Sequence, residues 1–272
     1  MDLTFEIIFC QGRIADRTPG AIEGAAKTAR ALQERTGLPP RSVGTPSPPK
    51  QDDWSSSLPE ATGTLTELQS EVADIFRRGQ RPLMAMNTCS ASLATLPVVA
   101  RVHPEATILW IDAHGDFNTP ETTGSGYLGG MVLAAVCGLW ESGLGQGVDP
   151  AKVVIAGARD IDPAEEELLR QAGVCVLSAE ETDPDSIVSI IGDRPVWIHV
   201  DWDSLEPGFV PAAYTVPNGL LPETLRAIFE KIPADQIIGV ELAEFEASSD
   251  GEKDATSLRF LMDAISPLLG SK

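Results

Sequence analysis

The sequence predicts a single three-layer αβα domain that spans residues 1–272 and is built on a mostly parallel sheet. Short apolar runs alternate with longer amphipathic stretches through most of the chain, which is typical of βαβ units. Neither an internal repeat nor a break in composition marks a second domain. Ligands of such sheets bind beyond the carboxyl ends of the strands, so we expect the functional residues there.

The expected strands are short apolar runs, and in chain order they are residues 3–9, 82–86, 107–111, 153–156, 174–177, 196–200 and 237–242. The expected helices are longer, with helical spacing or many alanines, and they are residues 20–35, 64–78, 90–101, 126–140, 163–172, 185–191, 222–231 and 256–269. Two stretches are expected to be loops: 38–59, which is rich in proline and serine, and 204–219.

Charge and composition exclude several classes of function. The formal net charge is −20, from 40 acidic and 20 basic residues, which argues against binding to nucleic acid or to an anionic membrane surface. No window approaches a membrane span, and the N-terminus lacks the basic region of a signal peptide. The four cysteines are widely scattered, so we expect a cytoplasmic protein with reduced thiols.

The strongest chemical motif is Asp112-Ala113-His114-Gly115-Asp116, directly after the expected strand 107–111. Asp112, His114 and Asp116 stand two residues apart, so in extended backbone their side chains point to one side. Three such ligands at the mouth of a sheet form a metal-site geometry. By itself, the motif fits an acidic loop that caps the next segment equally well.

A second cluster favours the metal. His199-Val200-Asp201-Trp202-Asp203 follows the expected strand 196–200 with the same spacing. Two strand ends that both carry carboxylates need a shared counter-ion, because like charges raise each other's pKa. This mixture of carboxylate and imidazole suits Mn²⁺, with Zn²⁺ or Fe²⁺ as alternatives. We interpret the two clusters as a binuclear metal site.

The order and spacing of these motifs resemble the ureohydrolases, the family of arginases and agmatinases, over nearly the whole chain. The resemblance implies that Asp112 and Asp201 bridge two metals and that His114 and Asp203 complete one site. It also implies that Asp116 binds the other metal and receives a proton from the attacking water. Glu244 falls at the family's guanidinium-binding carboxylate, and Thr215 falls where the family places a hydroxyl beside it.

The remaining metal position departs from the family pattern. Where arginases have a histidine, this chain has Cys89, in Met86-Asn87-Thr88-Cys89-Ser90. A cysteine at a helix N-terminus beside a cation is readily deprotonated, and a thiolate is a good ligand. The alternative is that Cys89 only fills space in the core. His199 is expected to orient a ligand from behind, and His103 to lie in an exposed loop.

The loop after Asp116 indicates the substrate. Asn118, Thr123 and Ser125 resemble the arginase residues that bind the α-carboxylate of the substrate, and Asp162 resembles the one that binds its α-amino group. Short polar donors and an anion are what an α-amino acid requires, and agmatine has no carboxylate. The other interpretation of this stretch is a turn rich in threonine and glycine.

A second departure concerns the head of the substrate. Gly129 stands where arginases carry a histidine, and Tyr127 replaces a smaller polar residue. Together with Cys89, this pattern resembles the branch of the family that hydrolyses Nω-hydroxy-L-arginine in D-cycloserine biosynthesis. The resemblance implies a substrate that is a guanidino amino acid, L-ornithine and hydroxyurea as products, and an enzyme that can form a homo-oligomer.

Two alternatives stay open at this point. One is an ordinary arginase, or a hydrolase of another guanidino or formimidoyl amino acid. The other is a non-catalytic protein with the arginase fold that binds a ligand or a partner chain. The second is disfavoured because a scaffold has no need for so many clustered carboxylates.

Overall fold

The computed structural model describes residues 4–269, and these form one eight-stranded sheet in which every pairing is parallel. The strands lie in the order β2-β1-β3-β8-β7-β4-β5-β6. Their bounds are β1 Phe5–Cys10, β2 Arg41–Val43, β3 Arg81–Met86, β4 Thr107–Ile111, β5 Val153–Ala158, β6 Cys175–Ser178, β7 Val196–Asp201 and β8 Ile237–Ala243.

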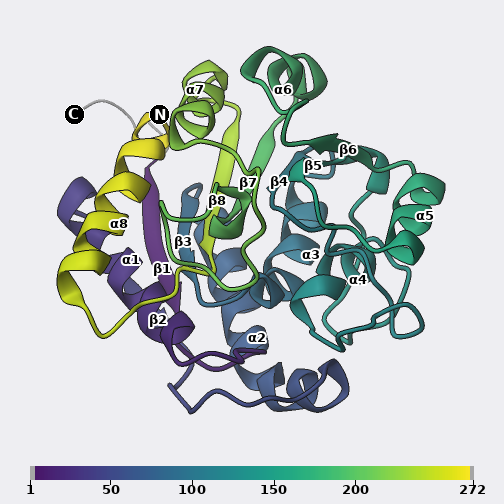
Figure 1. Cartoon of the computed structure of the whole chain (residues 1–272), viewed down its shortest axis with the longest axis horizontal. Helices are drawn as coiled ribbons and strands as arrows, with labels where there is room; N and C mark the ends of the chain where they lie inside the picture. The colour runs from purple at the N-terminus through teal and green to yellow at the C-terminus, as the bar shows by residue number, and fades with distance from the viewer. Residues whose placement is uncertain (1–3, 270–272) are drawn as a thin grey trace.

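Helices cover both faces of the sheet, which confirms the predicted three-layer domain (Figure 1). The helices are α1 Gly20–Thr36, α2 Trp54–Arg77, α3 Ser92–Val102, α4 Val132–Val136, α5 Pro163–Ala172, α6 Pro184–Ile191, α7 Pro222–Lys231 and α8 Gly251–Ala264. Buried side chains of α2, α3, α4 and α5 belong to one apolar cluster. Those of α1, α6, α7 and α8 belong to the other, on the opposite face.

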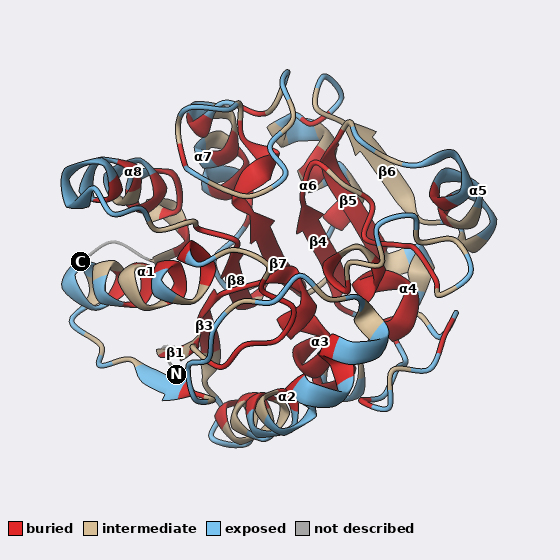
Figure 2. Ribbon diagram, turned by 60° about the horizontal axis from the view of Figure 1, so that its bottom comes forward, coloured by how far each residue is buried: buried red, intermediate tan, exposed pale blue. Residues whose placement is uncertain are grey.

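The central strands are buried on both faces, as is usual for a parallel sheet between two helical layers. All residues of β4 and β7 are buried, whereas the edge strand β6 is only partly covered (Figure 2). A row of apolar residues in β7 is interrupted by His199, which is fully buried. A buried imidazole in such a strand needs polar partners, and these lie next to the candidate site.

A close approach between α1 and the backbone at Phe245 fixes the segment after β8. A Cβ atom at Gly24 in α1 would lie only 1.6 Å from the carbonyl oxygen of Phe245. The absence of a side chain at Gly24 therefore lets α1 pack directly on the backbone that follows Glu244. Glu244 itself has a φ of 65°, in the left-handed region that residues other than glycine seldom adopt. Tight packing holds this strained residue at the end of β8.

Two predicted elements were wrong. The stretch 38–59 is not all loop, because β2 pairs with β1 and α2 begins at Trp54. Asp53 caps α2 by accepting hydrogen bonds from two backbone N–H groups, and Leu58 is buried, so packing and capping outweigh the unfavourable serines and Pro59. The expected helix 126–140 is reduced to a 3₁₀ turn and the five residues of α4. The apolar run of α4 is buried all round and is not amphipathic.

The remaining bounds differ by a few residues. Residue 3 of the first expected strand lies outside the described residues, and the expected closing helix 256–269 divides into α8 and a 3₁₀ turn, Ser266–Leu269. No helix within residues 4–269 has the length and apolarity needed to cross a membrane.

Candidate metal centre and substrate pocket

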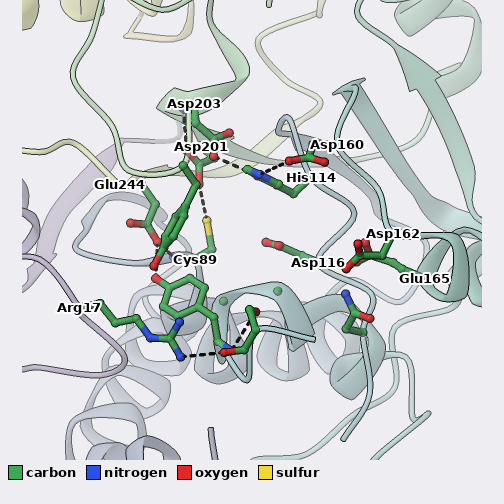
Figure 3. A pocket seen from close by; sticks show the side chains of 16 residues that line it. Arg17, Cys89, His114, Asp116, Asp160, Asp162, Glu165, Asp201, Asp203 and Glu244 are labelled. Carbon is green, nitrogen blue, oxygen red and sulfur yellow. Dashed lines mark hydrogen bonds and ion pairs between the residues drawn. The ribbon is translucent and has the colours of Figure 1, made fainter. Parts of the chain in front are cut away.

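Three of the predicted metal ligands and the predicted guanidinium-binding residue Glu244 come from neighbouring strands of the sheet. Cys89 follows β3, Glu244 follows β8, Asp201 ends β7, and Asp112 follows β4, and these four strands are adjacent in the order β3-β8-β7-β4. Because all the strands are parallel, their carboxyl ends meet at one edge of the sheet. Cys89, Asp201 and Glu244 line a pocket of about 210 Å³ at that edge (Figure 3).

Asp112, His114 and Asp203 form one compact group of potential ligands. His114 Nδ1 lies 3.0 Å from Asp203 Oδ2 and 3.3 Å from Asp112 Oδ1. The carboxylates are oriented by the chain around them: Asp112 accepts hydrogen bonds from the His114 backbone N–H and from Trp110 Nε1, and Asp203 accepts one from the Ala113 N–H. This arrangement brings together the two motifs that the sequence placed 90 residues apart.

Cys89 points into the same cluster. Its Sγ lies 3.0 Å from Asp201 Oδ2, and its backbone N–H donates to Glu244 Oε1 at 3.0 Å. Cys89, Asp201 and Glu244 form a second group of potential ligands, and Cys89, Asp112 and His199 form a third. The thiol therefore lies among carboxylates with which it could share a metal ion, and it also packs in the apolar core.

Asp116 lines the same pocket, at the start of the loop formed by residues 116–126. Its backbone has a φ of 48°, which turns the side chain back toward the pocket. Its Oδ2 atom is buried and finds no hydrogen-bond partner among residues 4–269. A buried carboxylate oxygen without a donor is costly, so this atom is placed for a cation.

The electrostatics of the cluster also favour a bound cation. Burial and the nearby Asp203 and Asp112 raise the pKa of Asp201 well above its usual value, and burial and Asp112 raise the pKa of Asp116 in the same way. Burial raises the pKa of Asp203 to about 6 and that of Glu244 to about 8. Bound divalent cations would remove this penalty, and the donor set of carboxylates, imidazole and thiol fits them.

Behind Cys89 lies a buried pair that supports it. Cys89 Sγ is 3.2 Å from His199 Nε2, and His199 Nδ1 is 2.9 Å from Glu241 Oε2. Glu241 also accepts hydrogen bonds from Ser92, Thr95 and Trp197, and the His199 ring is stacked on Trp110 with centroids 3.5 Å apart. These contacts agree with the predicted orienting role of His199.

The predicted substrate residues divide into two groups. Asn118, Ser125 and Asp162 line the pocket. Thr123 is not among the lining residues, and its Oγ1 accepts a hydrogen bond from the Gly126 N–H within the loop. Thr215 is exposed and does not line the pocket, whereas its neighbour Tyr214 does. Asn118 Oδ1 is engaged by Thr122 Oγ1, so its amide N–H groups remain to donate to a ligand.

The fold and the site agree with the comparison to known families. The sequence profile described as the arginase family matches residues 17–264. The chain belongs to the arginase family. Its structure superposes on an arginase from Bacillus cereus with a TM-score of 0.85 at 25% identity, covering 100% of this chain and 99% of that one.

Among curated relatives in the arginase family, one is similar over nearly the whole chain. It is the N(omega)-hydroxy-L-arginine amidinohydrolase of Streptomyces lavendulae, which is 52% identical over 262 residues, 96% of each chain. The arginase of Bacillus caldovelox is 30% identical over 188 residues, 63% of each chain. The similarity to the first is therefore both higher and more extensive.

Several residues that line the pocket of this arginase-family site were not predicted, and three of them are Arg17, Glu165 and Tyr214. Arg17 lies in the segment between β1 and α1, and Glu165 lies in the first turn of α5. Glu165 accepts a hydrogen bond from the Phe117 N–H at 2.7 Å, and burial raises its pKa to about 7. Tyr214 is the third. None carries a local signal, because each reaches the pocket only through the path of its loop or helix.

The metal-free protein is expected to become less stable as the pH rises from about 5 to about 8. The folded pKa values of Asp203 (about 6) and Glu244 (about 8) lie above their ordinary values, so folding holds protons that the unfolded chain has released. Burial lowers the pKa of His114, but hydrogen bonds to Asp112 and Asp203 outweigh it and raise the pKa to about 12, which acts in the same direction. The contribution of these groups to the free energy of unfolding is therefore present at low pH and is lost as the pH rises through these pKa values.

We expect the free energy of unfolding of the chelator-treated protein to fall by at least about 2 kcal/mol over this range. Urea unfolding at several pH values measures it, and Mn²⁺-loaded protein is the control. Equal stability at both ends of the range without metal would contradict the expectation.

Proposed function

We propose that this protein is a binuclear metal amidinohydrolase that cleaves Nω-hydroxy-L-arginine to L-ornithine and hydroxyurea. The observation that carries the substrate is the 52% identity, over 96% of both chains, with a relative named for that activity. The geometry supports it, because the two departures from an arginase, Cys89 and the pair Tyr127 and Gly129, all line the pocket.

The residues that would hold the metals are Cys89, Asp112, His114, Asp116, Asp201 and Asp203, and Mn²⁺ is the cation we propose, with Zn²⁺ or Fe²⁺ as alternatives. Bound cations of this kind supply a hydroxide at neutral pH by lowering the pKa of coordinated water. Three side chains of this set, Asp112, Asp201 and Asp203, are already oriented by hydrogen bonds from backbone N–H groups and from Trp110.

The other pocket residues bind the substrate and move its protons. Glu244 pairs with the planar head group at the bottom of the pocket. Asn118 and Ser125 donate to the α-carboxylate, and Asp162, which is exposed at the N-terminus of α5, faces the α-ammonium group. Asp116 accepts the proton of the attacking water and delivers it to the departing δ-nitrogen, so that water and substrate account for both products.

Thr123 and Thr215 have narrower parts in this proposal. Thr123 shapes the loop that presents Ser125, through its hydrogen bond to the Gly126 N–H. Thr215 would need the exposed segment around Tyr214 to close over a bound substrate before its hydroxyl came near Glu244. The proposed location is the cytoplasm, since all four cysteines are unpaired. Assembly into a homo-oligomer stays a prediction.

The deciding experiment is a turnover assay of Mn²⁺-loaded protein with Nω-hydroxy-L-arginine and L-arginine in parallel, with ornithine as the product measured. We expect kcat/KM to be higher for the hydroxylated substrate by at least about tenfold, which corresponds to one hydrogen bond of difference in the transition state. Equal or better use of arginine would identify an ordinary arginase. If neither substrate yields ornithine, the proposed substrate is wrong.

A further inference from the structure

Tyr127 occupies the space that a side chain at position 129 would need. A Cβ atom on Gly129 would lie 2.4 Å from Tyr127 Cε1 and 3.0 Å from its Cδ1, closer than such atoms approach. The ring in this position and any larger residue at position 129 therefore exclude each other. Gly129 is not simply a missing group, because its lack of a side chain admits the Tyr127 ring to the pocket.

The phenol of Tyr127 is held against the carboxylate that is proposed to bind the head group. Its oxygen donates to Glu244 Oε1 at 3.0 Å and lies 2.9 Å from Thr88 Oγ1. Thr88 Oγ1 in turn accepts a hydrogen bond from the Ser90 N–H, and its one hydroxyl proton points either to Tyr127 or to Ser90 Oγ, 3.2 Å away. With its own proton donated to Glu244, the phenol oxygen keeps at least one lone pair for a ligand in both cases.

The ring is also fixed from its faces. The guanidinium carbon of Arg17 lies 5.0 Å from the ring centroid, and the Tyr214 ring centroid lies 5.3 Å away. Arg17 itself is anchored by hydrogen bonds to the carbonyl oxygens of Asp52 and Ser125. The hydroxyl of Tyr127 is therefore positioned before any substrate arrives, which reduces the entropic cost of using it.

We propose that Tyr127 determines specificity by accepting a hydrogen bond from the N-hydroxyl group of the substrate head, next to Glu244. This inference rests on the proposed function. Glu244 Oε1 already accepts hydrogen bonds from the Cys89 N–H and from Tyr127. The hydroxyl of an N-hydroxyguanidine extends one atom beyond the nitrogen, and a polar partner beside Glu244 meets it. Arginine lacks this hydroxyl. When arginine is bound, the free lone pair of the Tyr127 oxygen therefore has no hydrogen-bond donor.

Tyr127 is proposed to recognise the N-hydroxyl group of the substrate and not to transfer a proton. Burial, followed by the charge of Glu244, raises the pKa of the Tyr127 phenol well above its ordinary value. The phenol therefore stays protonated throughout the working pH range, donates to Glu244 and keeps a lone pair for the substrate.

Tyr127→Phe tests the proposal, since it keeps the ring and removes only the oxygen. We expect kcat/KM for Nω-hydroxy-L-arginine to fall about 10- to 100-fold and kcat/KM for L-arginine to change less than about threefold. Tyr214→Phe is the matched control, because Tyr214 is the other tyrosine of the chain and lines the same pocket. It is expected to leave the ratio of the two constants unaltered.

Gly129→Ala is an independent variant, because the added methyl group displaces the Tyr127 ring without removing its oxygen. It is expected to lower the same ratio as Tyr127→Phe. A parallel loss on both substrates in the two variants would show a merely structural role and would overturn the proposal.

Binding of the head groups alone separates this inference from the proposed function. Inhibition or calorimetry with N-hydroxyguanidine and guanidine on Mn²⁺-loaded protein needs no turnover. We expect wild type to favour N-hydroxyguanidine and Tyr127→Phe to lose that preference.

If neither amino acid is hydrolysed but this preference exists and depends on Tyr127, the proposed reaction is wrong and the recognition stands. If wild type favours the hydroxylated compounds and Tyr127→Phe favours them equally, the recognition is wrong and the reaction stands. If wild type has no preference for N-hydroxyguanidine, the recognition is wrong as well.

Discussion

Asp201→Asn is expected to lower turnover by at least about a thousandfold, because Asp201 is proposed to hold the cations, whose contribution to the rate would amount to several kcal/mol. Asp201 is 4% exposed, and its Oδ2 lies 3.0 Å from Cys89 Sγ while its Oδ1 accepts the Asp203 N–H. The amide keeps the size of the side chain but lacks the charge. We expect bound manganese, measured by mass spectrometry after dialysis, to fall below the wild-type value together with the activity.

Asp160→Asn is the matched control for this change. Asp160 lines the same pocket, but its side chain is 65% exposed and its carboxylate lies 3.8 Å from His114 Nε2. An exposed ion pair of this kind contributes little, so manganese content and turnover are expected to stay within a few-fold of wild type. Wild-type turnover in Asp201→Asn would show that Asp201 does not bridge metals, even if the control behaves as expected.

Glu241→Ala is expected to destabilise the protein by about 3–5 kcal/mol, because each buried donor left without an acceptor costs about 1–3 kcal/mol. Glu241 and His199 are both fully buried, and Ser92, Thr95 and Trp197 donate to the same carboxylate. Alanine leaves all of these donors without an acceptor. Urea unfolding of the Mn²⁺-loaded variant measures the loss.

The same substitution is expected to weaken metal binding, because His199 then no longer holds the Cys89 thiol toward Asp201. Substitution of a residue that orients a metal ligand through a hydrogen bond commonly lowers metal affinity by about 10- to 100-fold. Glu241→Gln should lose less stability and less metal affinity than Glu241→Ala, because the amide oxygen of glutamine still accepts hydrogen bonds. Glu167→Gln is the control: it breaks an exposed ion pair with Arg170 and should leave the free energy of unfolding close to the wild-type value. A small loss for Glu241→Ala would mean that water or a shift of the chain replaces the carboxylate.

Much of the metal centre was predictable because its residues lie two apart at strand ends. In β4 and β7 the apolar run stops where the carboxylates begin, so both the strand and its chemistry are local patterns. Alternation in extended backbone then places Asp112, His114 and Asp116 on one side. The departure at Cys89 was visible for the same reason, since it follows β3 directly.

Where prediction failed, burial opposed local preference. Serine and proline near the start of α2 favour a loop, but Asp53 caps the helix and its apolar residues pack on β3. Conversely, the apolar stretch 126–140 looked helical, yet only Val132–Val136 is α-helical, because this part is surrounded by the core. In both cases, contacts with distant parts of the chain outweighed a local preference that amounts to fractions of a kcal/mol per residue, on the order of 0.5.

By itself, the sequence determined the fold class, the strands that carry the chemistry and the predicted metal ligands at their ends. These follow from periodicity and from spacing within a few residues. Only the tertiary structure decided that Tyr127 fills the place of a side chain at Gly129, that Glu241 supports Cys89 through His199, and that Arg17 and Glu165 line the pocket. Such pairings join positions that are far apart in the chain or depend on one side-chain rotamer. Local patterns carry no information about them, because they arise only when the strands and helices pack together.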